Sequence, residues 1–172
     1  MVEMEFRQHS VVHARALEDI REHGLHGERG ELQPMTHEVL DTFRALGAIQ
    51  KRNGIKAARR YIISFTKSAQ NVRDVYELNR LAFSHPEDVP VIDVIPLFEQ
   101  LEDLQNCVNV LEEIVKIPEV QARLKANRKF HPADTAVDYA VEGHCSFHLR
   151  YIPVIGTRFE LEIGRASCRE RV

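Results

Sequence analysis

Apolar residues that recur every three or four positions predict the first helices of this chain. Ser10 begins one such stretch, and Gly24 is well placed to end it. A longer stripe begins after Thr36, which would serve as an N-cap, and Gly54 would end it. Its apolar residues are Val39, Leu40, Phe43, Leu46 and Ile49. Two amphipathic helices are therefore expected before residue 55.

Three short runs of apolar, β-branched or aromatic residues predict strands. They occupy residues 2–6, 61–65 and 91–98. Helical patterns follow each run, with Ser68 as the expected cap of the helix after the second run. Pro118 is expected to separate two helices after the third. Strands that alternate with helices predict parallel βα units, so the expected fold class is α/β and rich in helix.

The composition excludes several classes of protein. Of 172 residues, 44% are hydrophobic and 28% are charged, which is ordinary for a globular protein. The net charge of −3 gives no electrostatic basis for binding nucleic acid or an anionic membrane. No apolar run approaches the roughly 18 residues of a membrane span, and the first residues do not form a signal peptide. Three scattered cysteines favour a reducing compartment, and Cys107 is expected to be a buried helical residue.

Polar residues lie where the predicted strands end, which is the edge that carries the chemistry in βα barrels. Arg7 follows the first strand, Ser64 to Lys67 follow the second, and Glu99 follows the third. A cation, a hydroxyl or second cation, and a carboxylate there would suit an anionic substrate and a divalent metal. Arg7 could equally form a surface salt bridge, and Glu99 could stabilise a helix N-terminus. The residues alone leave both interpretations open.

Three segments, in this order, resemble the phosphoenolpyruvate carboxylase family. They are FRQHSVVH (6–13), RYIISFTKSAQNVRDV (60–75) and VIPLFEQLEDLQN (94–106). The corresponding family patterns are RQ-x-S-x-x-H, a YVISM-type strand followed by a Ser-x-x-Asp/Asn-Val helix, and PLFET-x-x-DL. The resemblance covers roughly residues 2–128. It implies that residues 1–128 are part of a (β/α)8 TIM-type barrel, with three parallel strands and surrounding helices.

The resemblance also implies a function for the parent protein. Members of this family are carboxy-lyases that join bicarbonate to phosphoenolpyruvate and form oxaloacetate and phosphate, an anaplerotic reaction that feeds the citric acid cycle. They use Mg²⁺ or Mn²⁺ and no organic cofactor. The parent is accordingly expected to be a cytoplasmic homotetramer that binds neither nucleic acid nor membranes.

Roles for individual residues follow from the same resemblance. Glu99 matches one of the two metal-binding carboxylates, and Arg7 matches an active-site arginine whose guanidinium suits a phosphate or carboxylate. Gln8 and Ser64 are expected to support these two residues, and His13 to be structural. Phe65 and Gln100 stand where the family often has Met and Thr. Neither of these replacements is expected to touch a ligand.

Other family motifs are absent from the chain. They are a TAHPTE-type motif with the catalytic histidine and a GYSDS-x-K-D-x-G motif with the second metal carboxylate, so the isolated chain is expected to be inactive. Residues 129–161 do not align with the family and are interpreted as frame-shifted. Residues 162–172, EIGRASCRERV, match the translation of a common sequencing adapter and are interpreted as an artefact. The grouping of His144, Cys145 and His148 is therefore attributed to chance rather than to a metal site.

Two other functions remain open at this stage. A related barrel lyase could act on another enolpyruvate or 2-oxo acid with the same strand-end residues. A non-enzymatic helical interaction module could also carry βα units. The presence or absence of the TAHPTE and GYSDS motifs in the parent gene would separate the carboxylase from the related lyase.

Overall fold

A three-stranded parallel sheet organises the part of the chain that the structure describes. The computed structural model describes residues 5–127, 139–141 and 147–149, with side chains described for residues 8–124. The strands β1 (Glu5–His9), β2 (Arg60–Ser64) and β3 (Asp93–Pro96) lie in the order β1-β2-β3. A second, antiparallel pair consists of β4 (Tyr139–Val141) and β5 (Phe147–Leu149).

Helices connect and follow the parallel strands. The first connection contains α1 (Ser10–His23), α2 (Pro34–Asn53) and the short 3-10 helix η1 (Ile55–Ala57). The second contains α3 (Ala69–Leu81) and η2 (Pro86–Asp88), and the third strand leads into α4 (Leu101–Ile114) and α5 (Pro118–Asn127). The prediction of a helix-rich α/β chain with three parallel strands is therefore confirmed, while a closed barrel is not formed by the described residues.

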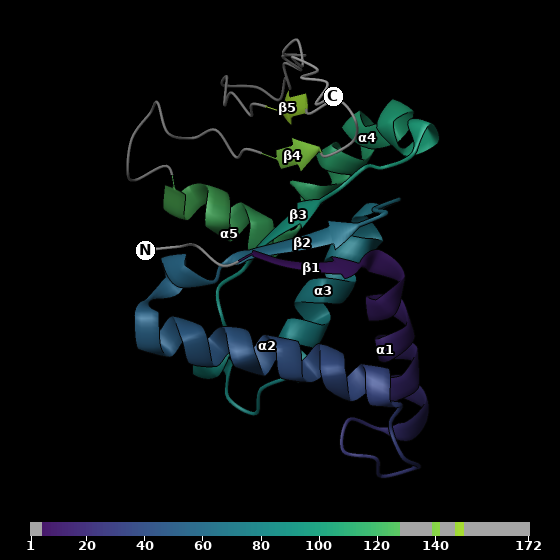
Figure 1. Ribbon diagram of the computed structural model, residues 1–172, viewed down its shortest axis with the longest axis vertical. Coiled ribbons are helices and arrows are strands. Elements are labelled where there is room, and N and C mark those ends of the chain that lie inside the picture. The colour runs from purple at the N-terminus through teal and green to yellow at the C-terminus, as the bar shows by residue number, and fades with distance from the viewer. Residues whose placement is uncertain (1–4, 128–138, 142–146, 150–172) are drawn as a thin grey trace, which may run out of the picture.

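One face of the sheet packs against helices α1, α2 and α3, which lie together on one side of the strands (Figure 1). Tyr61 and Ile63 of β2 and Val94 of β3 point into this core and are buried. Their neighbours Ile62 and Ile95 are half-buried, because alternate residues of a strand face opposite sides. The pairing is in register, so Arg7, Ile62 and Ile95 occupy equivalent positions on the three strands. The side of Ile62 and Ile95 is the less covered face of the sheet.

The strand boundaries differ from those expected. They depend on which residues pair between strands, and the sequence pattern does not show this pairing. The first strand was expected at residues 2–6, but β1 pairs with β2 from Glu5 to His9, so Arg7 lies inside the strand rather than after it. The second strand ends at Ser64 because Phe65 has a left-handed backbone with φ 55°. The third strand, β3, has only four residues, which lie within the predicted run 91–98.

Helix boundaries agree more closely with expectation. Helix α1 begins at Ser10 and ends before Gly24, and Gly54 ends α2 with a positive φ of 86°. Ser68 caps α3 through a reciprocal pair of hydrogen bonds with Asn71. The expected cap at Thr36 is wrong. Pro34, which suits the first turn of a helix, begins α2 with Gln33 as its N-cap, three residues earlier than expected, and Thr36 is a buried residue inside the helix.

Two further expectations concern the cysteine and the membrane. Cys107 lies in α4 as a free, buried thiol, as expected, and burial raises its pKa. Among the described helices, none has both the length and the apolar character that crossing a membrane requires.

Tyr61 joins the sheet to two helices at the centre of the core. Its hydroxyl donates to Gln8 Oε1 over 2.7 Å and lies 2.8 Å from Nε2 of His13 on α1. Because the single phenolic hydrogen goes to Gln8, His13 must donate from Nε2. The Tyr61 ring also stacks on Phe43 of α2, with ring centroids 5.1 Å apart. Burial lowers the pKa of His13 to about 4, so this histidine is neutral at pH 7.

Asp19 forms a second polar connection, between α1 and the start of α2. Its carboxylate accepts hydrogen bonds from Thr36 Oγ1 over 2.5 Å and from the Gln33 N–H over 2.8 Å. His23 Nδ1 lies 2.9 Å from the other oxygen. Burial raises the pKa of the Asp19 carboxyl, but these hydrogen bonds outweigh that effect and hold the pKa below its usual range. Asp19 therefore fixes how α1 and α2 meet.

Replacing Thr36 tests this connection. Thr36→Val keeps the shape but leaves a buried carboxylate without one donor, so the free energy of unfolding should fall by about 1.5–3 kcal/mol. Urea denaturation followed by circular dichroism measures the change. Thr42→Val is the matched control, because Thr42 is only half-buried and makes neutral hydrogen bonds, and it should cost less. An unchanged urea midpoint for Thr36→Val would contradict the role of Asp19.

The buried neutral state of His13 predicts a pH dependence of stability. The unfolded chain takes up a proton near the ordinary pKa of 6.5, whereas the folded chain takes it up only near 4. The unfolded state therefore binds more protons in this window, and stability is lost as the pH falls from about 6.5 towards 4. His13 should contribute about 2 kcal/mol to the loss between pH 7 and pH 5.

His13→Gln should remove this contribution. The measurement is the difference in unfolding free energy between pH 7 and pH 5, for wild type and variant under the same conditions. All other residues are the same in both proteins, so their contributions cancel in the comparison. An equal loss in both proteins would show that His13 is not the buried titrating group.

Candidate functional site

Glu99 is held at the carboxyl end of the sheet by backbone contacts that continue past β3. Leu97 N–H donates to Ile63 O over 2.9 Å, and Thr66 N–H donates to Leu97 O over 3.0 Å. These bonds carry the chain after β3 alongside the chain after β2. As a result, Phe65 N–H donates to Glu99 Oε2 over 2.9 Å. One carboxylate oxygen of Glu99 is thereby fixed in place by a main-chain group.

Phe65 brings the ends of all three strands together. Its left-handed backbone has φ 55°, which is uncommon for a residue other than glycine. Its carbonyl accepts a hydrogen bond from Ser10 Oγ over 2.8 Å, at the junction of β1 and α1. Its ring stacks on that of His9, with centroids 4.6 Å apart and planes 19° apart. Phe65 therefore links the end of β1 to the carboxylate that follows β3.

Gln8 and Ser64 lie between β1 and β2 rather than beside Glu99. Ser64 Oγ donates to the Gln8 carbonyl over 3.4 Å, and the Gln8 side chain contacts Tyr61 and Thr42. The hydrogen bonds of both residues hold β1 against β2 close to Arg7. The backbone of Arg7 pairs with Ile62, and its side chain is outside those that the structure describes. Its role remains a prediction.

The sequence interpretation missed Phe65 and His9. The contact of Phe65 with Glu99 is made by its main-chain N–H, so the expectation that the replacement at Phe65 touches no ligand stays a prediction. The contact uses the main chain, and a positive φ at a residue other than glycine leaves no signal in a single sequence. His9 lies within the RQ-x-S segment, but nothing in its spacing indicates stacking against a residue 56 positions away.

The described residues do not form a complete metal site. Glu99 offers the oxygen donor that Mg²⁺ prefers. However, within residues 8–124 no group of three or more His, Cys, Asp or Glu side chains is arranged to hold a metal ion. The side chains of His144, Cys145 and His148 lie outside the described residues. One carboxylate alone does not retain a divalent cation.

Comparison with known proteins identifies the family. Residues 21–132, more than half of the chain, match the family model described as phosphoenolpyruvate carboxylase. The chain belongs to the phosphoenolpyruvate carboxylase family. Glu99, Phe65 and Ser64 lie within the matched residues, and Arg7 and Gln8 precede them. The match does not favour the two alternatives, a related barrel lyase or a non-enzymatic module.

Curated phosphoenolpyruvate carboxylases from several bacteria are similar to part of this chain. The enzyme of Trichormus variabilis is 34% identical over 96 residues, which is 55% of this chain and 9% of that protein. Those of Gloeobacter violaceus and Nitrosomonas eutropha are 36% identical over 85 residues and 30% identical over 110 residues. These matches cover 48% and 62% of this chain, and 9% and 12% of the two relatives. The chain thus spans about a tenth of the length of these relatives.

The proposed boundaries at residues 128 and 161 stay predictions. The family match extends to residue 132. Beyond residue 127 the structure describes only the backbones of β4 and β5. The interpretation of residues 129–161 as frame-shifted concerns a segment that otherwise lies outside the described residues, and residues 162–172 lie wholly outside them.

The left-handed backbone of Phe65 predicts an unusual order of stability for two variants. Phe65→Gly and Phe65→Ala both remove the ring that stacks on His9, but only glycine adopts φ 55° without strain. Phe65→Gly should therefore be more stable than Phe65→Ala by about 1 kcal/mol. Urea denaturation measures the difference.

An exposed position nearby supplies the control. Lys67 has no positive φ, so Lys67→Gly should be the less stable member of its pair with Lys67→Ala. If Phe65→Gly were also the less stable of its pair, the left-handed conformation would not be a constraint on this turn.

Proposed function

We propose that this chain carries part of the active site of a phosphoenolpyruvate carboxylase that joins bicarbonate to phosphoenolpyruvate, giving oxaloacetate and phosphate. The observation that carries the proposal is the position of Glu99. It belongs to the PLFE motif, lies within the residues that match the family, and is held at the carboxyl end of a parallel strand. That edge is where enzymes with βα barrels bind their substrates.

A (β/α)8 barrel in the parent enzyme accounts for the unequal faces of the sheet. The face of Tyr61 and Val94 is covered by helices, whereas Ile62 and Ile95 on the other face are only half-buried. In a closed barrel, the inward face of every strand is filled by side chains from the other strands. Arg7 occupies the register position of Ile62 and Ile95, so we place it on the inward face.

Glu99 is proposed as one ligand of Mg²⁺ or Mn²⁺. The other ligands would come from parts of the parent enzyme that lie outside this chain. Within this chain, the N–H of Phe65 holds one oxygen of the carboxylate, and this contact sets the direction of the Glu99 side chain. The side chain then loses little rotational freedom when it binds a cation. Phe65 therefore acts as a positioning residue.

Arg7 is proposed to bind the phosphate or carboxylate of the substrate. Its guanidinium can donate two parallel hydrogen bonds to either group and stabilise negative charge during phosphoryl transfer. Gln8 and Ser64 contribute indirectly, because the hydrogen bonds of Gln8 with Tyr61 and Ser64 hold β1 against β2 at the residue next to Arg7. The parent enzyme is proposed to be a cytoplasmic homotetramer that supplies oxaloacetate to the citric acid cycle.

A chimeric enzyme tests the proposal. Residues 5–127 would replace the matching segment of the Gloeobacter violaceus enzyme, and oxaloacetate formation would be followed through its reduction by malate dehydrogenase and NADH. The chimera should be active, whereas the 172-residue chain alone should not be, because it lacks the TAHPTE and GYSDS motifs. Glu99→Gln in the chimera should lower kcat by roughly 100-fold or more, because it removes a charged metal ligand.

Glu102→Gln is the matched control for this experiment. Glu102 lies in the exposed first turn of α4, three residues from Glu99, and should tolerate the same change. A Glu99→Gln chimera as active as the Glu102→Gln chimera would overturn the proposed role of Glu99. A folded tetrameric chimera without any activity would count against the assignment of this segment to the active site.

A further inference from the structure

His9 lies at the carboxyl end of β1, where this strand leads directly into α1 (Figure 1). It is exposed, and its register partner is Ser64, the last residue of β2. Its ring stacks on the ring of Phe65, whose N–H holds Glu99. The histidine is therefore next to the residue that orients the proposed metal ligand, yet the proposed reaction assigns it no role.

The imidazole of His9 is fixed in one tautomer. Its Nδ1 accepts a hydrogen bond from the N–H of Val11 over 3.2 Å and thereby caps α1. A ring nitrogen that accepts carries no hydrogen, so the neutral imidazole has its hydrogen on Nε2. The stacking against Phe65 holds the plane of the ring at the same time. His9 thus presents one N–H donor, Nε2, in a defined orientation.

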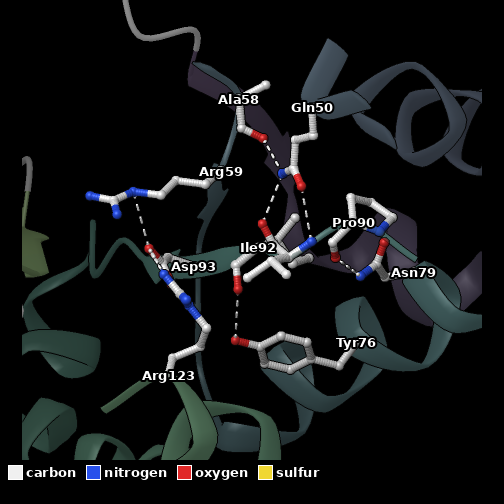
Figure 2. Close-up of polar contacts among 10 residues, drawn as sticks. Gln50, Ala58, Arg59, Tyr76, Asn79, Pro90, Ile92, Asp93 and Arg123 are labelled. Carbon is white, nitrogen blue, oxygen red and sulfur yellow. Dashed lines mark hydrogen bonds and ion pairs between the residues drawn. The ribbon is translucent and has the colours of Figure 1, made fainter. Parts of the chain in front are cut away.

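This donor has no acceptor within the part of the chain whose side chains the structure describes, residues 8–124. By contrast, charged groups at the opposite end of the sheet bind one another, as Figure 2 shows. Asp93 accepts two hydrogen bonds from Arg123, over 2.7 and 3.3 Å, and pairs with Arg59 over 3.4 Å. The carboxyl end therefore retains a donor that is available to a ligand.

The tautomer limits what His9 can bind through Nε2. A metal ion needs a nitrogen lone pair, but the free lone pair of this ring is on Nδ1 and already receives the N–H of Val11. A general base needs the same lone pair. An N–H suits a hydrogen-bond acceptor instead, and the strongest acceptors are anionic oxygens such as those of phosphate and carboxylate groups.

The strand places His9 on the same face as Arg7. Gln8 lies between them and points into the core, where it contacts Tyr61 and Thr42. Because alternate residues of a strand face opposite sides, residues 7 and 9 share the less covered face and lie about 7 Å apart along the strand. This is the face on which Arg7 is proposed to bind the substrate.

We propose that His9 is an additional substrate-binding residue, which donates its Nε2–H to an anionic oxygen of phosphoenolpyruvate, on the phosphate or carboxylate that Arg7 binds. The inference rests on the proposed function. Arg7 supplies positive charge, and His9 adds a directed hydrogen bond that fixes the position of the oxyanion.

Two variants of His9 separate substrate binding from helix capping. In His9→Asn, the side-chain oxygen still caps α1, because asparagine is a preferred N-cap, but the Nε2–H is lost. In His9→Gln, the longer side chain keeps an N–H donor near the position of Nε2, but glutamine is not a preferred N-cap. Both variants lose the ring that stacks on Phe65, so this loss cancels between them.

Each change would be made in the chimeric enzyme that contains residues 5–127. His9→Asn should raise the KM for phosphoenolpyruvate roughly tenfold, with a smaller change in kcat, because a hydrogen bond to a charged group is lost. His9→Gln should raise this KM less, and the KM for bicarbonate should stay constant in both. In urea denaturation the order should be the reverse, with His9→Asn less damaging than His9→Gln.

Inorganic phosphate, used as an inhibitor, shows which group of the substrate His9 contacts. Its Ki should rise with the KM in His9→Asn if the contact is to the phosphate, and should stay constant if it is to the carboxylate. His37→Asn is the matched control, because His37 is exposed in the first turn of α2, and it should leave the KM unchanged.

Three results would overturn the inference. A KM that rises as much or more in His9→Gln as in His9→Asn would show that His9 acts through the cap or the ring. An unchanged KM in His9→Asn, in a chimera that Glu99→Gln inactivates, would overturn the role of His9 but leave the proposed function intact. An inactive chimera with His9 unaltered would overturn both.

Discussion

The phenol group of Tyr61 is the interaction on which the fold of this segment depends. A single buried side chain contacts the neighbouring strand through Gln8, helix α1 through His13 and helix α2 through the ring of Phe43. Burial raises the pKa of the phenol, so its hydrogen remains available to Gln8. With Tyr61 in this position, both helices of the first connection are anchored on the central strand. The ends of β1 and β2 are then aligned, which the contacts of Phe65 require.

Alignment of the strand ends is what brings residues of three separate sequence motifs into contact. The left-handed turn at Phe65 places its N–H on Glu99 and its carbonyl on Ser10, which follow different strands. The main chain thereby orients one oxygen of the carboxylate that follows β3. The tight turn, rather than a further charged side chain, gives this edge of the sheet its geometry.

The sequence predicted the secondary structure well where periodicity and caps agree, as in α1 and at Ser68 and Gly54. It failed at Thr36, whose hydroxyl binds the carboxylate of Asp19 on another helix instead of capping its own. It also misplaced β1, because the length of an edge strand depends on its partner. For the candidate site, the PLFE motif located Glu99 at the end of a strand. The contact between Glu99 and Phe65 could not be predicted, because a backbone N–H does not depend on the residue type.

The long connection between β1 and β2 has a consequence for folding. The contact between Ser10 and Phe65 closes 55 positions of chain, whereas that between Phe65 and Glu99 closes 34. Loop-closure entropy grows only with the logarithm of length, so the longer connection costs about 0.4 kcal/mol more to close. In return it contains α2, whose Val39, Leu40, Phe43 and Leu46 are at most 1% exposed. A βα unit of this kind can thus acquire a whole extra helix at small entropic cost, because the helix contributes its own share of the core.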